Sequence, residues 1–205
     1  MLITFEGCEG CGKSTQSTLL KECLEKTNQA FVYAREPGGT EISEKIRSVI
    51  LDKENSAMTA ECEALLYAAS RAQLIKQVIL PSLKEGKIVI LDRYLDSSLA
   101  YQAYARELTY DFVAKVNSYA MENCMPDVTI FLDITPEKAF LRKGGADKSD
   151  RMELAGLQFH NKVYEGYLKL AKMFPDRFVT FTDEGGVEHM HQLIIDYLRQ
   201  KGYIK

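Results

Sequence analysis

The chain has 205 residues, of which 46% are hydrophobic and 27% are charged, and its formal net charge is −3 at pH 7. This composition is typical of a globular protein whose length suits one domain with a sizeable core. The slightly acidic balance argues against a broad basic surface for nucleic acid, and no apolar run approaches the roughly 18 residues of a membrane span. No basic region precedes the apolar N-terminus, so we expect no signal peptide, and five scattered cysteines indicate reduced thiols in the cytoplasm.

Predicted strands and helices alternate along the whole sequence. In chain order, the apolar patterns predict a strand at 2–5, a helix at 13–26, a strand at 30–34, helices at 41–51 and at 59–84 with a bend near Pro81, a strand at 87–91, helices at 95–105 and 109–123, a strand at 127–132, a helix from 136, a polar loop at 144–149, a helix at 154–173, a strand at 177–181 and a helix at 187–200. This order predicts one α/β domain, residues 1–205, with a parallel sheet and helices on both faces.

A phosphate-binding loop lies between the first predicted strand and the first predicted helix. Gly7 is followed by four residues and then by Gly12-Lys13-Ser14, which is the P-loop pattern in the context that it requires. Glycines let backbone amides converge on an anion, and the helix N-terminus adds its N–H groups and dipole. Lys13 is expected to reach the β- and γ-phosphates of a nucleotide, and Ser14 to bind Mg²⁺. The residues predicted to bind this nucleotide are Gly7, Cys8, Glu9, Gly10, Cys11, Gly12, Lys13, Ser14 and Thr15.

The same loop contains a Cys-x-x-Cys pair, Cys8 and Cys11. A structural zinc site needs four ligands, usually from two such pairs, and the sequence has no second pair, so we do not expect zinc here. A thiol near a helix N-terminus and Lys13 is expected to have a lowered pKa and raised reactivity. We therefore predict that alkylation or oxidation of these cysteines blocks nucleotide entry.

The third predicted strand ends in Asp92-Arg93. An acid at this place commonly holds Mg²⁺ in P-loop proteins, and an arginine beside the metal suggests a clamp on a second phosphate. Other arginines fall in loops or on helix faces that could turn to the same cleft: Arg35, Arg47, Arg71, Arg142 and Arg151. Together they favour transfer to a phosphate acceptor, whose oxygen is already anionic and needs no general base.

Six segments resemble bacterial thymidylate kinases, in the right order and over most of the chain. They are FEGCEGCGKSTQ at 5–16, REPGGT at 35–40, LLYAASR at 65–71, LDRYLDSSLAYQ at 91–102, PDVTIFLD at 126–133 and DRMEL at 150–154. The resemblance implies a P-loop nucleoside monophosphate kinase fold with a five-stranded parallel sheet. It also implies transfer of a phosphoryl group from ATP to dTMP with Mg²⁺, for dTTP synthesis, and a homodimer. The helix at 109–123 has an apolar stripe that suits core packing or a dimer face.

The resemblance also implies a role for each matching residue. Arg93 would bridge the donor and acceptor phosphates, and Arg47 would hold the dTMP phosphate. The other residues implied for dTMP are Glu36 and Pro37 along the site, Tyr67 stacked on thymine, Arg71, Ser98 and Gln102 at the base, and Tyr101 at the deoxyribose. Ser14 and Asp92 would hold the metal. A lid at about 142–151 would supply a cation to the transition state, from Arg142 or Arg151.

The side chains assigned to the base predict which nucleotide is accepted. Arg71 has only donors, so it would favour a carbonyl such as thymine O4, and Gln102 suits the N3–H beside it. We therefore expect dTMP to be the best acceptor, dUMP to be modestly weaker, and dCMP and dGMP to be far worse.

Other function classes fit the sequence less well. A GTPase needs an Asn-Lys-x-Asp motif, which the sequence lacks, and a nucleoside kinase needs a base for the sugar hydroxyl, which we do not find. A nucleotide-dependent binding protein without catalysis would leave Arg93 idle, and ATP consumption with and without dTMP would distinguish it. His160, His189 and His191 have no ligand-like partners in the sequence and are interpreted as surface residues.

Overall fold

The computed structural model describes residues 1–142, 150–182 and 185–205. Within these residues, one parallel sheet holds five strands in the order β2-β3-β1-β4-β5. The strands are β1 (Leu2–Glu6), β2 (Phe31–Arg35), β3 (Ile88–Asp92), β4 (Val128–Asp133) and β5 (Phe178–Thr182). The predicted five-stranded parallel sheet is confirmed, and each strand ends one residue later than the sequence pattern predicted.

Helices follow the strands. They are α1 (Lys13–Lys26), α2 (Glu41–Leu51), α3 (Ala60–Leu74), α4 (Leu80–Lys84), α5 (Leu95–Ser98), α6 (Tyr110–Val116), α7 (Ser118–Asn123), α8 (Pro136–Arg142), α9 (Gly156–Met173) and α10 (Gly186–Gln200). Short 3₁₀ turns occur at η1 (Lys53–Asn55) and η4 (Glu153–Ala155), and π-helical turns at η2 (Ile75–Ile79) and η3 (Leu99–Ala105). Threonine side chains cap several helices: the Thr40 hydroxyl accepts from the Ser43 amide before α2, Thr59 accepts from Cys62 before α3, and Thr109 accepts from Phe112 before α6.

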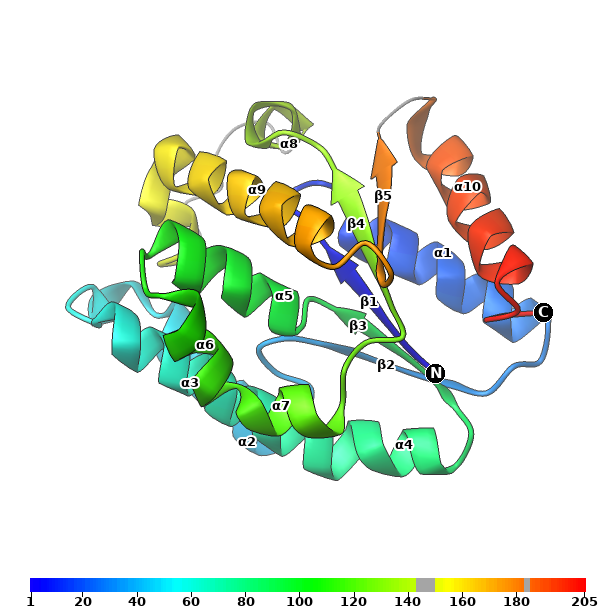
Figure 1. The fold of residues 1–205 in the computed structure, drawn as a ribbon, viewed down its shortest axis with the longest axis horizontal. Helices are drawn as coiled ribbons and strands as arrows, with labels where there is room; N and C mark the ends of the chain where they lie inside the picture. The colour runs from blue at the N-terminus through cyan, green and yellow to red at the C-terminus, as the bar shows by residue number, and fades with distance from the viewer. Residues whose placement is uncertain (143–149, 183–184) are drawn as a thin grey trace.

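The sheet has helices on both faces, as predicted (Figure 1). On one face, α1 and α10 bury side chains such as Leu20 and Ile194 against β1, β3 and β4. On the other face, α3, α5, η3, α6 and α9 cover a second cluster that includes Leu74, Leu99 and Val163. Because β1 and β3 are covered on both sides, every residue in each of these two strands is buried, which explains their continuous apolar runs.

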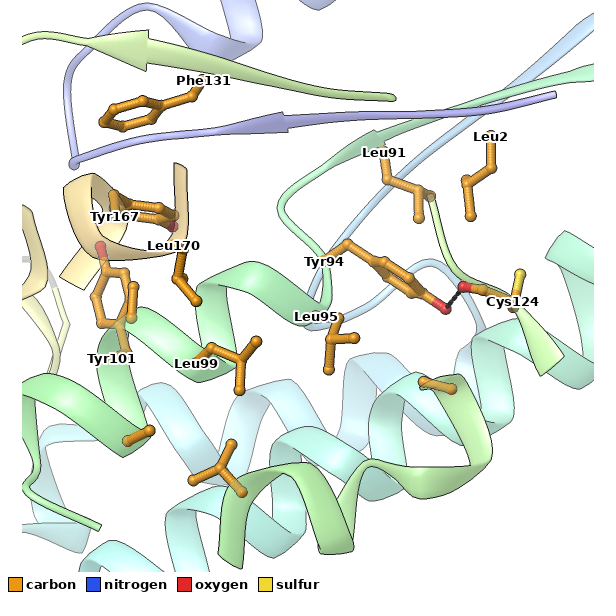
Figure 2. Close-up of a cluster of buried hydrophobic side chains, with 14 of the residues drawn as sticks. Leu2, Leu91, Tyr94, Leu95, Leu99, Tyr101, Cys124, Phe131, Tyr167 and Leu170 are labelled. Carbon is orange, nitrogen blue, oxygen red and sulfur yellow. Dashed lines mark hydrogen bonds between the residues drawn. The ribbon is translucent and has the colours of Figure 1, made fainter. Parts of the chain in front are cut away.

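The second cluster joins side chains of the central strands to those of η3 and α9 (Figure 2). The ring of Phe131 on β4 stacks on Tyr167 of α9 at 5.3 Å between centroids. Tyr101 of η3 lies beyond Tyr167 in the same cluster. At the other end of the cluster, the hydroxyl of Tyr94 donates to the carbonyl of Cys124 over 2.9 Å. These aromatic contacts fix η3 and α9 relative to the central strands.

Three predicted helices are subdivided in the structure. The predicted helix at 59–84 consists of α3, a π-helical turn and α4, and the one at 95–105 consists of α5 and a π-helical turn. The predicted helix at 109–123 divides at Asn117, whose buried side chain donates to Val113 and accepts from Arg71. A π-helical turn shifts the helical register, and such turns often occur at functional sites. Most of the predicted lid, at 143–149, lies outside the described residues.

Candidate active site

A cavity of about 390 Å³ opens at the carboxyl ends of β1 and β3, where open α/β sheets commonly bind ligands. It brings together most of the predicted site residues: Glu9, Gly10, Gly12, Lys13, Ser14, Thr15, Glu36, Pro37, Arg47, Tyr67, Asp92, Arg93, Ser98, Tyr101 and Gln102. Six predicted residues do not line it: Gly7, Cys8, Cys11, Arg71, Arg142 and Arg151. The lining also includes residues that we did not assign to ATP, dTMP or metal: Arg35, Leu51, Ser97, Asp150, Met152, Glu153 and His160.

The P-loop joins β1 to α1 in a path that needs its glycines. Gly7 has φ +139°, and a Cβ there would lie 2.8 Å from the carbonyl oxygen of Leu132. Gly12 precedes α1 in the left-handed region, with φ 100°. The Lys13 ammonium donates to the carbonyls of Cys8 at 2.8 Å and Gly7 at 3.2 Å. Lys13 therefore lies across its own loop, on carbonyl acceptors that a phosphate can replace.

The prediction of lowered cysteine pKa values in this loop is wrong. Cys8 and Cys11 are each 1% exposed, and Cys11 belongs to the core cluster beneath α1 and α10. Burial raises the pKa of the Cys8 thiol to about 12 and also raises the pKa of Cys11, although the charge of Lys13 acts in the opposite direction. Desolvation of the thiolate outweighs the lysine because both sulfurs point into the protein.

Ser14 and Asp92 supply a pair of oxygen ligands at the edge of the cavity. The Ser14 hydroxyl donates to the Asp92 carboxylate over 2.7 Å, because the register of β1 and β3 places their carboxyl ends side by side. Among the described residues, no three His, Cys, Asp or Glu side chains are grouped to hold a metal ion. Mg²⁺ usually takes one or two protein oxygens and completes its shell with water and phosphate. The pair therefore fits a magnesium ion that arrives with a nucleotide, and the grouping does not fit zinc.

Arg93 also lines the cavity. It follows β3 with φ 69°, an uncommon backbone conformation for a residue other than glycine. Its guanidinium donates to the carboxylate of Glu9 at 2.6 Å and to the carbonyl of Gly7 at 3.1 Å, and it lies 5.2 Å from the ring centroid of Tyr101. Arg93 thus links the P-loop with η3, and its charge faces the space between them.

The buried carboxylate of Glu6 is linked to Arg93 through the hydroxyls of Ser97 and Tyr167. Glu6 at the end of β1 accepts from the hydroxyls of Ser97 and Tyr167, each at 2.7 Å, and from the Tyr94 amide at 2.7 Å. The hydroxyls of Ser97 and Tyr167 also lie 3.3 Å from Arg93. Burial, together with the charge of Asp96, raises the pKa of Glu6 above its ordinary value. This network fixes the turn between β3 and α5.

Arg71 lies just behind the cavity wall, and its side chain is 1% exposed. It donates to both Glu36 and the Tyr94 carbonyl, and to the side chains of Ser98 and Asn117. Four of its five N–H groups therefore donate hydrogen bonds to the protein, and its predicted contact with a base stays a prediction. Arg71 holds Glu36 and Ser98, which do line the cavity. Burial raises the pKa of Glu36 to about 7, although Arg71 acts to lower it.

Two further predicted residues line the cavity from α2 and α3. Arg47 of α2 donates to the carbonyl of Pro37 over 2.9 Å, and Tyr67 of α3 is half-buried. Both side chains line the cavity, so a cation and an aromatic ring lie near each other at the junction of α2 and α3. The neighbouring Arg35 is paired with Glu44 at 3.2 Å on the exposed side.

The two predicted lid arginines, Arg142 and Arg151, lie in different segments of the chain and differ in exposure. Arg142 is exposed at the end of α8. Arg151 donates to the carboxylate of Glu63 at 2.6 Å and to the carbonyl of Ile50 at 2.8 Å, which anchors it on α2 and α3. Glu63, which the sequence reasoning missed, also accepts from Gln102 of the cavity wall. No short motif marks Glu63, and only its contacts identify it.

The interpretation of His160 as a surface residue is wrong. The side chain is 2% exposed, lines the cavity, and packs edge to face against Phe140 and Tyr101. Burial lowers its pKa. Its helical spacing with Val163 and Tyr167 was the signal that could have placed it on the buried face of α9.

The sequence model described as thymidylate kinase matches residues 5–194 of the chain. Thymidylate kinase of Thermoanaerobacter sp. (strain X514) is 48% identical over 198 residues, 97% of either chain, and that of Bacillus velezensis is 49% identical over 182 residues, 88% of this chain and 86% of the relative. The crystal structure of thymidylate kinase from Ehrlichia chaffeensis matches with a TM-score of 0.77 and 32% identity, over 97% of this chain and 98% of that one. The chain therefore belongs to the thymidylate kinase family and is a dTMP kinase, which forms dTDP from dTMP with ATP.

Proposed function

We propose that ATP binds over the P-loop, that dTMP binds against α3 and η3, and that their phosphates meet beside Arg93. One observation supports this arrangement above all: Lys13, Asp92 and Arg93 line the same cavity as Tyr67 and Gln102. A cavity of about 390 Å³ is within the range of ligand sites. Residues predicted to bind phosphate and residues predicted to bind a base therefore share one cavity.

The donor phosphates would replace the internal contacts of the P-loop. Lys13 exchanges its bonds to the Gly7 and Cys8 carbonyls for phosphate oxygens, and the amides at the start of α1 donate to the same anion. Ser14 and Asp92 hold Mg²⁺, which neutralises charge on the phosphates when it is bound. The 2.7 Å contact between these two side chains supports this assignment.

The transfer step needs no general base. An oxygen of the dTMP phosphate, already anionic, attacks the γ-phosphorus of ATP, the bond from that phosphorus to the bridging oxygen breaks, and ADP leaves. The main obstacle is repulsion between two polyanions. Arg93 lies between the P-loop and η3, so its guanidinium can contact both phosphates and lower that repulsion. Glu9, paired with Arg93 at 2.6 Å, holds the guanidinium in this orientation.

The acceptor would lie along the wall built by α2, α3 and the REPGGT segment. Arg47 holds the dTMP phosphate, since its guanidinium lines the cavity and is oriented by the Pro37 carbonyl. Tyr67 offers an aromatic face on which thymine stacks. Glu36 and Pro37 form the floor beside them.

The base and the sugar would be read from α3, α5 and η3. Gln102 and Ser98 face the base, and Tyr101 is bulky enough to crowd a 2′-hydroxyl. Arg71 is 1% exposed and does not line the cavity, so it reaches thymine O4 only if its side chain shifts towards the base. In its present position, Arg71 holds Glu36 and Ser98 in place by hydrogen bonds.

The lid would complete the site. Arg142 and Arg151 flank residues 143–149, and either guanidinium can reach the transferred phosphoryl group if the segment closes over ATP. Arg151 must then leave Glu63 and the Ile50 carbonyl. Either arginine is a candidate for a cation that acts in the transition state.

The protein would act as a cytoplasmic homodimer. None of the five cysteines forms a disulfide, which supports a reducing compartment. Among the described residues, no helix is long and apolar enough to span a bilayer. Ile42 and Val49 on α2 and Leu65 on α3 are large apolar side chains exposed on two helices that pack together, which supports a contact between copies of the chain.

The residue assignments are tested by a panel of phosphoryl acceptors with ATP. We expect kcat/KM to be highest for dTMP, about 10–200-fold lower for dUMP, which lacks one methyl group, and lower by orders of magnitude for dCMP and dGMP. The ribose form of TMP is also expected to be poor. ATP consumption measured without any acceptor is the control for hydrolysis of ATP by water. Equal use of dCMP and dTMP would contradict the roles given to Arg71 and Gln102.

A further inference from the structure

Glu63 of α3 is a buried carboxylate that lies next to the acceptor wall without lining the cavity. The side chain is 1% exposed and accepts four hydrogen bonds. Its Oε1 accepts from Nε2 of Gln102 at 2.9 Å and from Nε of Arg106 at 3.2 Å. Its Oε2 accepts from Nη2 of Arg106 at 3.1 Å and from Nη2 of Arg151 at 2.6 Å. Two cations therefore keep this buried group ionised.

The ionised state decides what Glu63 can do for its neighbours. Burial alone would raise the pKa of Glu63, but hydrogen bonds and charge from Arg106, with hydrogen bonds from Gln102 and Arg151, hold the pKa below its ordinary value. A carboxylate is an acceptor only. Gln102 must therefore turn its NH₂ group towards Glu63, because the opposite amide orientation would place two oxygens against each other.

This constraint fixes what Gln102 presents to a ligand. Gln102 is 1% exposed and lines the cavity. Its NH₂ group is used by Glu63, and no donor among the described residues reaches its Oε1. The cavity side of this amide is thus a hydrogen-bond acceptor. An acceptor rewards the N3–H of thymine or uracil, whereas cytosine has a lone pair at the same ring position.

We propose that Glu63 is a positioning residue that sets the pyrimidine selectivity of the acceptor site by locking the amide orientation of Gln102. Glu63 does not line the cavity and acts on the base through Gln102. The inference rests on the proposed role of Gln102 at the base. The new element is that Glu63, which does not line the cavity, determines whether Gln102 presents a donor or an acceptor to the base. Arg106 and Arg151 keep the Glu63 carboxylate charged.

The test is Glu63→Gln, which keeps the shape of the side chain but can present either an oxygen or an NH₂ group to Gln102. The Gln102 amide is then able to rotate and to offer its own NH₂ group to the cavity. We expect the ratio of kcat/KM for dTMP to kcat/KM for dCMP to fall at least about tenfold, through a loss with dTMP and a gain with dCMP. A purely structural role would lower both values in parallel and leave the ratio unchanged, and this result would overturn the proposal.

Three variants separate the possible causes. Arg106→Gln removes a cation from Glu63 but keeps the contact between Glu63 and Gln102, so its ratio should stay near that of the wild type. Glu63→Asp, which retains an acceptor-only carboxylate, should keep a ratio closer to wild type than Glu63→Gln does. In a Gln102→Leu background, adding Glu63→Gln should have no further effect on the ratio. If Glu63→Gln does not fold, the paired variant Glu63→Gln with Arg106→Gln removes one cation together with the carboxylate and is measured instead.

The same variants distinguish this proposal from the one on which it rests. If Gln102→Leu leaves the ratio of dTMP to dCMP unchanged, Gln102 does not read the base and its assigned role is wrong. If Gln102→Leu changes the ratio but Glu63→Gln does not, the role of Gln102 stands and the role of Glu63 is overturned.

Discussion

Charged side chains in the site are held by hydrogen bonds and ion pairs. Because these side chains are buried, breaking such a contact costs free energy. Glu36 is 5% exposed, bonded to Arg71 through Oε2, and its Oε1 has no partner among the described residues. Arg93 and Lys13 are likewise bound to groups of the protein, and substrate phosphates would take over some of these bonds. The charged residues of the site thus already have protein partners in the free protein, and bound phosphates would replace some of these partners.

Glu36 makes stability depend on pH. Because burial raises its folded pKa to about 7, the native state holds this proton more tightly than the unfolded chain, and stability falls as pH rises from about 4.5 to 7. Glu36→Gln mimics the protonated form, so the wild type should lose up to about 3 kcal/mol relative to this variant across that window. Urea unfolding at a series of pH values measures the difference. Glu61→Gln, at an exposed position of the same helix as Arg71, is the control, and an equal slope for the two variants would refute the assignment.

The P-loop cysteines should resist alkylation in the folded protein. Cys8 and Cys11 are buried and burial raises both thiol pKa values, whereas Cys62 is exposed on α3. Iodoacetamide treatment at pH 8, followed by peptide mass spectrometry, should modify Cys62 well before either loop cysteine. Cys62 is thus an internal control within the same sample. Modification of Cys8 at the rate of Cys62 would show that the loop opens in solution.

At the scale of elements, sequence patterns predicted the strands and most helices because apolar spacing reports directly which face is buried. They did not predict the π-helical turns, because apolar spacing does not separate a π-helical turn, such as η3 packed against α9, from an α-helix. The same limit applies to the site. The P-loop and Asp92-Arg93 are local motifs and were found. Glu63 was missed because its role depends on contacts with distant segments, whereas the helical spacing of His160 with Val163 and Tyr167 was a local signal that was overlooked.

Close packing of α9 on η3 depends on Gly166. A Cβ at this position would lie 3.0 Å from Cβ of Tyr104 and 3.2 Å from Cα of Ala100. Gly166→Ala should therefore destabilise the protein by about 1–3 kcal/mol, despite the higher helix propensity of alanine. It should also raise KM for dTMP, because η3 carries Tyr101 and Gln102. Thermal unfolding compares it with Glu165→Ala at an exposed neighbouring position, and an unchanged or higher Tm for Gly166→Ala would contradict this packing.

At the scale of the whole molecule, the helices on the two faces of the sheet expose different apolar side chains to solvent. The layer containing α1 and α10 buries a core of its own and exposes Leu193 on α10 at 41%. The paired helices α2 and α3 expose Ile42 at 52%, Val49 at 46% and Leu65 at 52%. Because α3 also carries Tyr67 and Glu63, a partner seated on α2 and α3 would brace the wall against which dTMP is proposed to bind.

The oligomeric state tests this surface. Two identical chains related by a two-fold axis bring the same patch of each copy together, so a charge placed in the patch is buried twice. We expect the wild type to be a dimer at micromolar concentration and Leu65→Glu to be largely monomeric, as measured by sedimentation equilibrium. Leu193→Glu introduces the same charge at a similarly exposed leucine on the opposite layer and should remain dimeric. A monomeric wild type, or a Leu65→Glu variant as dimeric as Leu193→Glu, would show that α2 and α3 do not form the interface, since a glutamate cannot be buried there without a large loss of association free energy.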